Sequence, residues 1–562
     1  AFRSDRRLFA VTYATLYPDL PRRPTMTMPQ RPRLRWEVSM STRVPFGVSP
    51  SPSLMTRRDV LRAFGAMGGS SLMMGAMSAC GLMGTSTPRP ALQGQGRPPN
   101  TRVIVLGAGI SGLATGYELG KLGYDYQVLE AREWVGGLCW TVRRGAEHTE
   151  VGGERQVCDF DEGQYLNAGA WRIPNDDEGV LGYCRELDVP LELFVNWSDA
   201  NYMWEENPER GPLAGRRVRL REVKADLWGS TTELLAKAME QGQIDAPLTE
   251  EDQELLVRFL VRAGYLDSDD LVYRPPRLRG SGNQGPYDLS ALLNSGFATQ
   301  VRSLNAGTGG PHPVFQPIGG MQQIPLAFQR AMGDKITLQA EVQSIHQTED
   351  AVRVVYRDTR TGREHEEIGD YCVCCLPMSI LQRIDVDLSP AMANAVNESG
   401  HSNSAKMGLQ MKRRFWEEDD GIFGGHLFAR SLQLGEFSYP SNDYFTEKGV
   451  LLGYYGGGQT AGLGDMPVQG RIEHVLTQAS KVHPQMREEF ETGYCVWWDK
   501  VPYSLGAYGR TPPRERLQQL SQADGRIYMG SAGASSQPAW IEGGIQSAWR
   551  SVETLHERVM QG

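Results

Sequence analysis

Cysteine and histidine, the side chains that most often bind zinc, are scarce in this chain. There are eight cysteines and nine histidines among 562 residues. No cysteine lies near a spaced pair of histidines, and three cysteines gather in YCVCCLP, which has the apolar pattern of a buried strand. Cysteines in such a strand act as small core hydrophobes. The sequence therefore predicts no zinc site, and the scattered histidines form no catalytic pattern.

Positive charge exceeds negative charge only in the first hundred residues. Residues 1–100 contain fourteen Arg and four Asp or Glu, a net charge of +10, so the total of −9 leaves −19 for residues 101–562. This acidic body has no basic stripe with interleaved aromatic residues. The pattern argues against a protein that binds nucleic acid.

Long apolar runs are rare, and one weakly apolar run, Ala63 to Ala79, follows the pair Arg57–Arg58. This pattern predicts a twin-arginine export signal that begins at Met55, and hence a periplasmic or extracellular protein. A transmembrane helix is the alternative, although the glycines and serines of the run make it poor at spanning a bilayer. Ser78-Ala79-Cys80 loosely resembles a lipoprotein cleavage box, which would place a lipid tether on Cys80.

The segments on either side of this signal have no periodicity. Residues 1–54 are rich in Arg, Pro and Ser, and we interpret them as a non-native or disordered extension. Residues 55–99 are interpreted as the signal and a linker, of which 81–99 form the disordered linker.

A glycine-rich turn after an apolar strand is the most informative feature of the body. Gly107, Gly109 and Gly112 form GxGxxG directly after Val103–Leu106, and Glu130 follows the next strand. The first glycine permits a tight turn, the second lets a pyrophosphate approach the backbone, and the third lets helix and strand pack closely. The phosphates would meet the N-terminus of a helix beginning near Ser111. The sequence therefore predicts a dinucleotide site.

A chain of this length is expected to form two or more domains. Helical periodicity dominates residues 176–310, ITLQAEVQSIHQ and AVRVVYRD predict a hairpin, and a last helix is expected from about Gly544 to Val559. We predict a discontinuous nucleotide-binding domain from residues 100–175, 311–400 and 520–562. Residues 176–310 and 401–519 would form a helical and substrate-binding domain.

Several short motifs lie in a specific order over roughly residues 100–560. They are GAGISGL at 107–113, LEA at 129–131, NAGAWRIP at 167–174, PIGGMQQIP at 317–325, AKMGLQ at 405–410, GVLLGYY at 449–455, WDKVPYSLGAY at 498–508 and PAWIEGGIQSA at 538–548. In this order they resemble the flavin-containing amine oxidases, and among them the L-amino acid oxidases. The resemblance implies an α/β fold in which a Rossmann-like FAD-binding domain is interleaved with a substrate domain of antiparallel sheet and helices.

The resemblance also implies roles for individual residues. Arg172 would clamp a substrate α-carboxylate, a bidentate task that suits a guanidinium. Tyr454 would contact the same carboxylate, and Trp540 would form an aromatic wall near the substrate amine. Lys406 would hold a water against the flavin and assist its reoxidation by dioxygen. The side-chain pocket would include Tyr508 and Ala539.

The residues expected to bind non-covalent FAD come mainly from the glycine-rich turn, the AEV strand and the C-terminal motif. They are Gly107, Gly109, Ser111, Gly112, Glu130, Ala131, Gly136, Gly137, Arg172, Val342, Ser531, Ala532, Trp540 and Ile541. Two positions depart from the family pattern. Leu138 stands where the family has an arginine near the FAD phosphates, and Ala532 replaces an acid on the flavin chain. These losses would weaken FAD binding.

The reaction implied is oxidation of an L-amino acid by hydride transfer from Cα, giving a 2-oxo acid, ammonia and hydrogen peroxide. Alternatives are an amino acid 2-monooxygenase that forms an amide, a simple amine oxidase, and a cofactor-poor, non-catalytic relative. Trp498, Tyr508 and Trp540 favour an apolar or aromatic substrate side chain. The expected partners are the amino acid and dioxygen, with a second copy of the chain in a homodimer.

Overall fold

The structure, a computed structural model, describes residues 100–243, 248–276, 285–306, 313–457 and 461–561. All of them belong to one compact unit, Arg57–Gly562. The predicted signal and tether, with Arg57, Arg58 and Cys80, lie outside the described residues. Among the described residues, no helix combines the length and apolar character needed to cross a bilayer.

A parallel five-stranded sheet is built from segments that lie far apart in the sequence. Its strands run in the order β12 (Ile336–Thr337), β2 (Asp125–Leu129), β1 (Arg102–Leu106), β16 (Tyr371–Cys374) and β23 (Ile527–Met529). Alternate residues of β1 enter different cores: Val103 and Val105 face one cluster, and Ile104 and Leu106 face another. Both faces of the sheet are therefore covered, as parallel sheets require.

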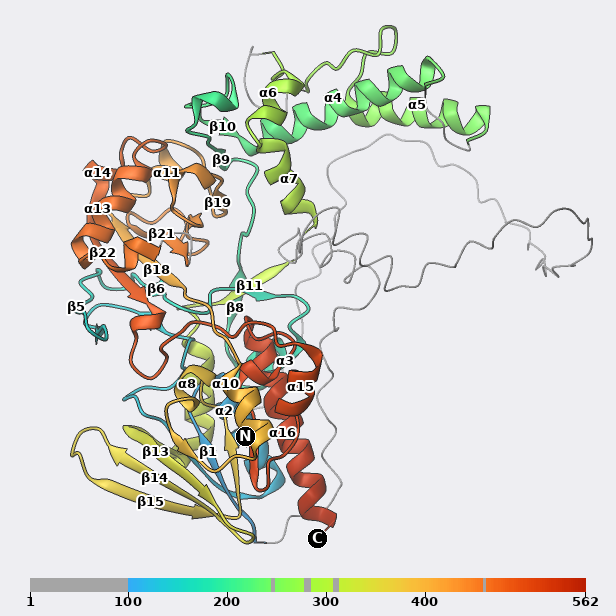
Figure 1. The fold of residues 1–562 in the computed structure, drawn as a ribbon. Coiled ribbons are helices and arrows are strands. Elements are labelled where there is room, and N and C mark those ends of the chain that lie inside the picture. The colour runs from blue at the N-terminus through green and yellow to red at the C-terminus, as the bar shows by residue number, and fades with distance from the viewer. Residues whose placement is uncertain (1–99, 244–247, 277–284, 307–312, 458–460, 562) are drawn as a thin grey trace, which may run out of the picture. The chain divides into compact units, whose positions relative to one another are not determined.

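Helices from the two ends of the body cover one face of this sheet (Figure 1). Helix α2 (Ile110–Leu122) follows β1, and α16 (Ile541–Gln561) packs beside it, with Leu113 and Ile545 in one core. The structure starts α16 three residues before the expected Gly544. Helix α8 (Gln323–Met332) completes this layer. The N-termini of α2 and α16 thus lie together at the carboxyl end of the sheet.

A second sheet has the order β15 (Glu364–Gly369), β14 (Val352–Asp358), β13 (Ala340–Gln347) and β17 (Asp385–Val386). Its β13–β14 hairpin is the one predicted from the alternating pattern. The register shifts between Val342 and Ser344, so that Gln343 forms a bulge. Strand β13 pairs with β17 only at Ser344 and Ile345, which leaves the Val342 end beyond that ladder.

The third sheet is antiparallel, in the order β19 (His426–Leu427), β20 (Phe437–Ser438), β21 (Gly449–Gly456), β18 (Ala405–Met411) and β22 (Phe490–Trp497). Every residue of β18 is buried. Helices α11 (Phe415–Glu418), α13 (Val468–Ala479) and α14 (Met486–Glu489) accompany these strands. The sheet therefore lies inside a second core that supplies fixed positions for side chains.

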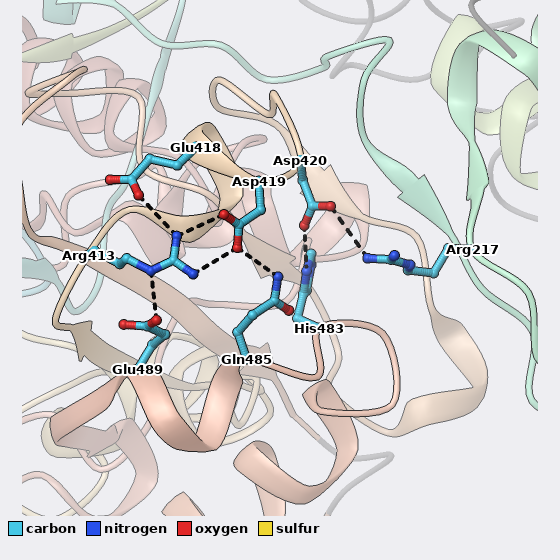
Figure 2. A network of polar contacts seen from close by, with 8 residues as sticks. All are labelled: Arg217, Arg413, Glu418, Asp419, Asp420, His483, Gln485 and Glu489. Carbon is cyan, nitrogen blue, oxygen red and sulfur yellow. Dashed lines mark hydrogen bonds and ion pairs between the residues drawn. The ribbon is translucent and has the colours of Figure 1, made fainter. Parts of the chain in front are cut away.

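A network of charged side chains joins the turns beside this sheet, as Figure 2 shows. Arg413 forms ion pairs with Glu418, Asp419 and Glu489. Asp420 accepts a hydrogen bond from the fully buried His483, at 3.1 Å. Burial raises the pKa of Asp420, but the hydrogen bond from His483 and the nearby cations outweigh it, so the pKa stays below its usual value.

Helices α4 (Leu220–Glu240), α5 (Glu250–Gly264), α6 (Leu289–Asn294) and α7 (Phe297–Ala306) lie within residues 176–310, where helical periodicity is expected. Between 191 and 219 that block contains short strands instead. Helix α5 begins with a capping box, in which Thr249 and Asp252 satisfy each other's backbone N–H groups. Helices α4 and α5 pack through their own small core, which includes Ala236 and Leu260. Strands β9 (Tyr202–Met203) and β10 (Val218–Arg219) pair just before α4, and β7 (Ile173–Pro174), β11 (Val314–Pro317) and β8 (Leu191–Leu193) form a small sheet in the order β7-β11-β8.

Candidate active site

A cavity of about 790 Å³ opens where the strands of the parallel sheet end. Gly107, Glu130, Cys375 and Ser531 line it, and each follows the carboxyl end of a strand, β1, β2, β16 or β23. Ligands of open α/β sheets bind at this edge. The cavity also reaches β18 of the antiparallel sheet, at Lys406. One continuous space therefore connects the nucleotide motif with the substrate domain.

Most of the residues predicted from the sequence line this one cavity. They are Gly107, Gly109, Ser111, Glu130, Ala131, Gly136, Gly137, Arg172, Val342, Lys406, Tyr508, Ser531, Ala532, Ala539, Trp540 and Ile541. The two predicted residues that do not line it are Gly112 and Tyr454.

Gly112 acts through packing, as the motif predicts. A Cβ on Gly112 would lie 1.8 Å from the carbonyl oxygen of Gly107, so no side chain fits there. Gly107 itself has a φ of +90° and donates its N–H to the Leu129 carbonyl at 2.7 Å. A Cβ on Gly109, by contrast, would be 4.0 Å from the Gly137 Cα, its nearest neighbour. The turn therefore has no room for a side chain where it faces the helix, at Gly112, and it leaves free space where it faces the cavity, at Gly109.

Glu130 is held by backbone amides, and the Arg132 guanidinium lies 4.0 Å from its Oε1. Its Oε2 accepts the Ala108 N–H at 2.8 Å, and its Oε1 accepts the Arg132 N–H at 3.0 Å. Each carboxylate oxygen has a further lone pair, so the group can also accept hydrogen bonds from ribose hydroxyls. The carboxylate is 5% exposed and lines the cavity, which fits a nucleotide ribose.

Arg132 is a cavity residue that the sequence reasoning missed. Its guanidinium donates to the Pro502 carbonyl at 2.9 Å and to the Ser504 hydroxyl at 2.7 Å. Burial lowers the pKa of Arg132. The signal that could have identified Arg132 is its position two residues after Glu130. Because Leu138 lacks the guanidinium expected nearby, a cation elsewhere at the nucleotide end was to be sought. Arg132 places a buried positive charge in the nucleotide end of the cavity.

The C-terminal motif contributes a polar atom without a partner. Ser531 Oγ is buried and has no hydrogen-bond partner in the described chain. Such groups in native proteins are normally satisfied by a ligand or water. A Cβ on Gly544 would lie 2.6 Å from Ser111 Oγ, so this glycine lets the start of α16 approach that of α2. The unpartnered hydroxyl and the two helix N-termini fit a dinucleotide cofactor.

Lys406 is the central cation of the substrate end. It is 2% exposed and donates from Nζ to the Gly169 carbonyl at 2.6 Å. Nζ also lies 4.8 Å from the centre of the Trp171 ring and 4.6 Å from that of Tyr455. Burial lowers the pKa of Lys406 well below its usual value, and the nearby charge of Arg172 adds to this effect. This lysine can therefore lose and regain a proton far more easily than a surface lysine.

Arg172 precedes β7 (Ile173–Pro174) and enters the same end of the cavity. Its guanidinium lies 4.9 Å from the centre of the Trp171 ring. Within the described ranges, no carboxylate forms an ion pair with Arg172 and no acceptor takes a hydrogen bond from it. A half-buried guanidinium without an anion is poised to bind one.

The prediction for Tyr454 is wrong by one residue. Tyr454 is fully buried on the other side of β21, where its ring stacks on Trp497 at 5.5 Å. Tyr455 lines the cavity instead. The register between β18 and β21 shifts at Gly453, between the pairs Met407–Tyr454 and Gly408–Leu452. This bulge changes which residues of the strand face the cavity, and counting alternate residues does not reveal it.

Aromatic residues form the wall between the cations and the antiparallel sheet. The Trp171 ring lies 5.9 Å from that of Tyr455. Tyr455 is hydrogen bonded to Tyr508, and burial raises its pKa, so its hydroxyl stays protonated. Trp498 is 1% exposed and donates to the Ala168 carbonyl at 2.7 Å. In the part of the chain that the structure describes, no group of three His, Cys, Asp or Glu side chains could hold a metal ion.

Comparison with known proteins agrees with this geometry. The sequence pattern of the flavin containing amine oxidoreductases matches residues 110–556. An L-amino-acid oxidase of Pseudechis australis is 25% identical over 492 residues, covering 83% of this chain and 86% of its own. One of Vipera ammodytes ammodytes is 26% identical over 467 residues, covering 79% and 90%.

Solved structures support the same fold. Putrescine oxidase bound to putrescine superposes with a TM-score of 0.54 at 19% identity, covering 82% of this chain and 99% of that one. The mixed sheets and helices described above are therefore those of the amine oxidase fold. Together with the cavity at the carboxyl end of the parallel sheet, the match over most of the chain shows that this protein belongs to the flavin containing amine oxidoreductase family.

Proposed function

We propose that this flavin-dependent oxidoreductase oxidises L-α-amino acids to 2-oxo acids and ammonia, with dioxygen as electron acceptor and hydrogen peroxide as product. The observation that carries the proposal is the unpaired Arg172 guanidinium beside Lys406 and the aromatic wall. A simple amine offers this cation no anion, whereas an amino acid offers its carboxylate. The named relatives, L-amino-acid oxidases that match about four fifths of the chain, support the same choice.

The proposed cofactor is FAD. A carboxylate at the ribose position, a glycine turn at two helix N-termini and an unpartnered Ser531 hydroxyl fit its adenosine, pyrophosphate and flavin chain. When bound, the flavin accepts the hydride of the substrate Cα and passes the electrons to dioxygen. Arg132 supports the nucleotide end, where Leu138 supplies no charge.

We propose that FAD is held without a covalent bond. Two cysteines line the cavity, Cys139 and Cys375. Burial raises the pKa of Cys139 to about 12 and that of Cys375 even more, so neither is a thiolate at neutral pH. A thiol attacks only as its thiolate. Precipitation with acid should therefore release the flavin into the supernatant.

At the substrate end, some residues would bind the amino acid and another would exchange a proton. Arg172 orients the amino acid through its carboxylate, and Trp540 and Tyr508 exclude water from the reacting carbon. Lys406 holds its proton loosely because it is buried beside a second cation. It can therefore exchange a proton with a water held in the cavity while the electrons move to dioxygen.

Amino acid 2-monooxygenase activity would use the same binding groups, and it differs only in its product. Peroxide release and product analysis with purified protein and each L-amino acid test the proposal. A 2-oxo acid with one equivalent of peroxide is expected. An amide product would favour the monooxygenase, and oxidation of amines alone would favour a simple amine oxidase. Absence of bound flavin after reconstitution would leave the non-catalytic relative.

We also propose export through the twin-arginine route, with a lipid on Cys80 as a tether and a homodimer as the working form. The basis for export is the arginine pair and the run that follows it. Replacing both Arg57 and Arg58 with lysine should keep the protein in the cytoplasm. Delivery unchanged by that double substitution would contradict the export proposal.

A further inference from the structure

Two helices of the insert, α4 and α5, expose large apolar side chains. Trp228 and Leu235 of α4 are 50% and 37% exposed, and Leu255 and Phe259 of α5 are 53% and 55% exposed. The two helices pack through a small core of their own, separate from the cores of the sheets. Single exposed apolar residues are common on soluble proteins, whereas a contiguous group of them marks a surface that binds a partner.

The four side chains do form a contiguous group. Only nine residues separate the end of α4 from the start of α5, so the two neighbouring helices run in opposite directions (Figure 1). The Trp228 indole donates to the Ala263 carbonyl at 2.8 Å, which places this ring beside the last turn of α5. Phe259 lies one turn before Ala263, and Leu255 lies one turn before Phe259. Leu235 lies two turns after Trp228, so it is the α4 neighbour of Leu255.

Charged residues continue this apolar face along α5. Glu251 lies in the first turn of the helix and Arg262 in the last. Glu251, Leu255 and Arg262 follow one another at spacings of four and seven residues, so they lie along one stripe of the helix. Within the described ranges, neither Glu251 nor Arg262 forms an ion pair. The stripe is therefore acidic at one end, apolar in the middle and basic at the other end.

This order of charges makes the stripe complementary to a second copy of itself. When two α5 helices meet antiparallel about a two-fold axis, the acidic end of each helix faces the basic end of the other. Glu251 of each copy then faces Arg262 of the other, and Leu255 of each copy faces Phe259 of the other. Every contact occurs twice, as a two-fold interface requires. An acidic lipid surface, in contrast, would be repelled by the acidic first turn.

We propose that this face of α4 and α5, made of Trp228, Leu235, Leu255 and Phe259, is the contact surface between two copies of the chain. The inference rests on the homodimer of the proposed function and gives it an interface, in which two helices from each copy form a four-helix bundle. Buried aromatic rings supply much of the affinity of such interfaces, and charges at the rim select the direction of pairing. These four described residues do not line the cavity, so each copy keeps a complete active site.

Replacement of a central ring tests the apolar part of the interface. In analytical ultracentrifugation at micromolar concentration, the purified wild-type protein should sediment as a dimer. Phe259→Asp should raise the dimer Kd by at least about 100-fold, because a charge takes the place of a buried ring. Phe445→Asp, at a phenylalanine that is 84% exposed outside α4 and α5, is the matched control and should leave the dimer intact. Thermal unfolding shows whether each variant is folded.

An exchange of charges tests the pairing of α5 with itself. Glu251→Arg and Arg262→Glu each bring like charges together at two symmetric places, and each should raise the Kd about tenfold. The double variant Glu251→Arg/Arg262→Glu restores opposite charges and should return the Kd to within about threefold of the wild-type value. Glu250→Arg reverses a charge in the same helix turn but off the stripe, so it is the control for effects on the helix itself.

Three results would overturn the interface: a wild-type protein that stays monomeric, a dimer that survives Phe259→Asp, or a double variant that binds no more tightly than the single variants. Binding of the monomer to phosphatidylcholine vesicles, lost in Phe259→Asp, would assign the face to a membrane instead. Peroxide release per chain with L-amino acids is measured on the same samples and should change less than about twofold among the variants. Its absence in the wild type would refute the proposed oxidation and leave the interface standing.

Discussion

Lys406 combines complete burial with a neighbouring cation, and this combination makes its proton labile. The Lys406→Met substitution keeps the length of the side chain and removes the exchangeable proton. We expect reoxidation of the reduced flavin by dioxygen to slow about 100-fold, the lower end for loss of a general acid or base. Reduction of the flavin by amino acid under anaerobic conditions should change less than about threefold.

Stopped-flow absorbance separates these two half-reactions. Lys412→Met, at an exposed lysine that follows β18, is the control and should leave both rates unchanged. Equal slowing of reduction and reoxidation in Lys406→Met would mean that the lysine only shapes the cavity.

The residues of the site were predictable where a motif fixes them through the backbone. Gly107, Gly109 and Glu130 follow from the demands of a nucleotide on a strand and turn, and all three line the cavity. Tyr454 was not predictable, because the bulge at Gly453 depends on pairing with β18.

The turn between β1 and α2 tolerates no side chain at Gly112, since a Cβ would overlap the Gly107 carbonyl at 1.8 Å. Gly112→Ala must push the helix away from the strand. We expect the free energy of unfolding to fall by about 1–3 kcal/mol, the usual range for overpacking, with weaker retention of flavin. Gly182→Ala in α3 (Glu178–Glu186) meets no atom within 4 Å and is the control.

Removing a glycine from a helix interior stabilises it by roughly 0.5–1 kcal/mol, so Gly182→Ala should unfold at a slightly higher temperature. Thermal unfolding and the ratio of flavin to protein absorbance check both variants. A Gly112→Ala protein that keeps wild-type flavin content and stability would show that the turn is looser than described.

At the level of elements, periodicity predicted the strands and helices but not their partners. The hairpin β13–β14, the buried strand β16 and the long helices of the insert follow from their patterns. The insertion of β16 between β1 and β23 does not, because it joins segments that are more than 150 residues apart in the sequence. Order of motifs across the whole chain supplied that information.

Acid should destabilise the whole molecule through two buried imidazoles. Burial lowers the pKa of both His148 and His426 to about 4. Below the unfolded value of about 6.5 the unfolded chain gains protons that the folded chain does not. The two neutral imidazoles therefore cost no stability above about pH 6.5. As the pH falls from about 6.5 to about 4, the free energy of unfolding falls by about 3 kcal/mol for each histidine.

Asp177 acts in the opposite direction. Burial, together with the nearby Glu542, raises its pKa to about 8, so acid favours the folded state at this position. In this pH range the effect of His148 and His426 together exceeds the opposite effect of Asp177. The free energy of unfolding should therefore still fall between pH 6.5 and 4. Urea unfolding at several pH values measures this slope. His148→Gln should make it shallower, and a slope unchanged by that substitution would contradict the assignment.

The proposed selection of an amino acid over an amine depends on the Arg172 guanidinium. The decisive measurement is kcat/KM of wild type and Arg172→Ala for an L-amino acid and for the amine that remains when its carboxylate is removed. We expect the value for the amino acid to fall about 30- to 1000-fold, or roughly 2–4 kcal/mol, with flavin content intact and the amine unaffected or improved. Equal losses for the two substrates would show that Arg172 is structural and would contradict the assignment to amino acids.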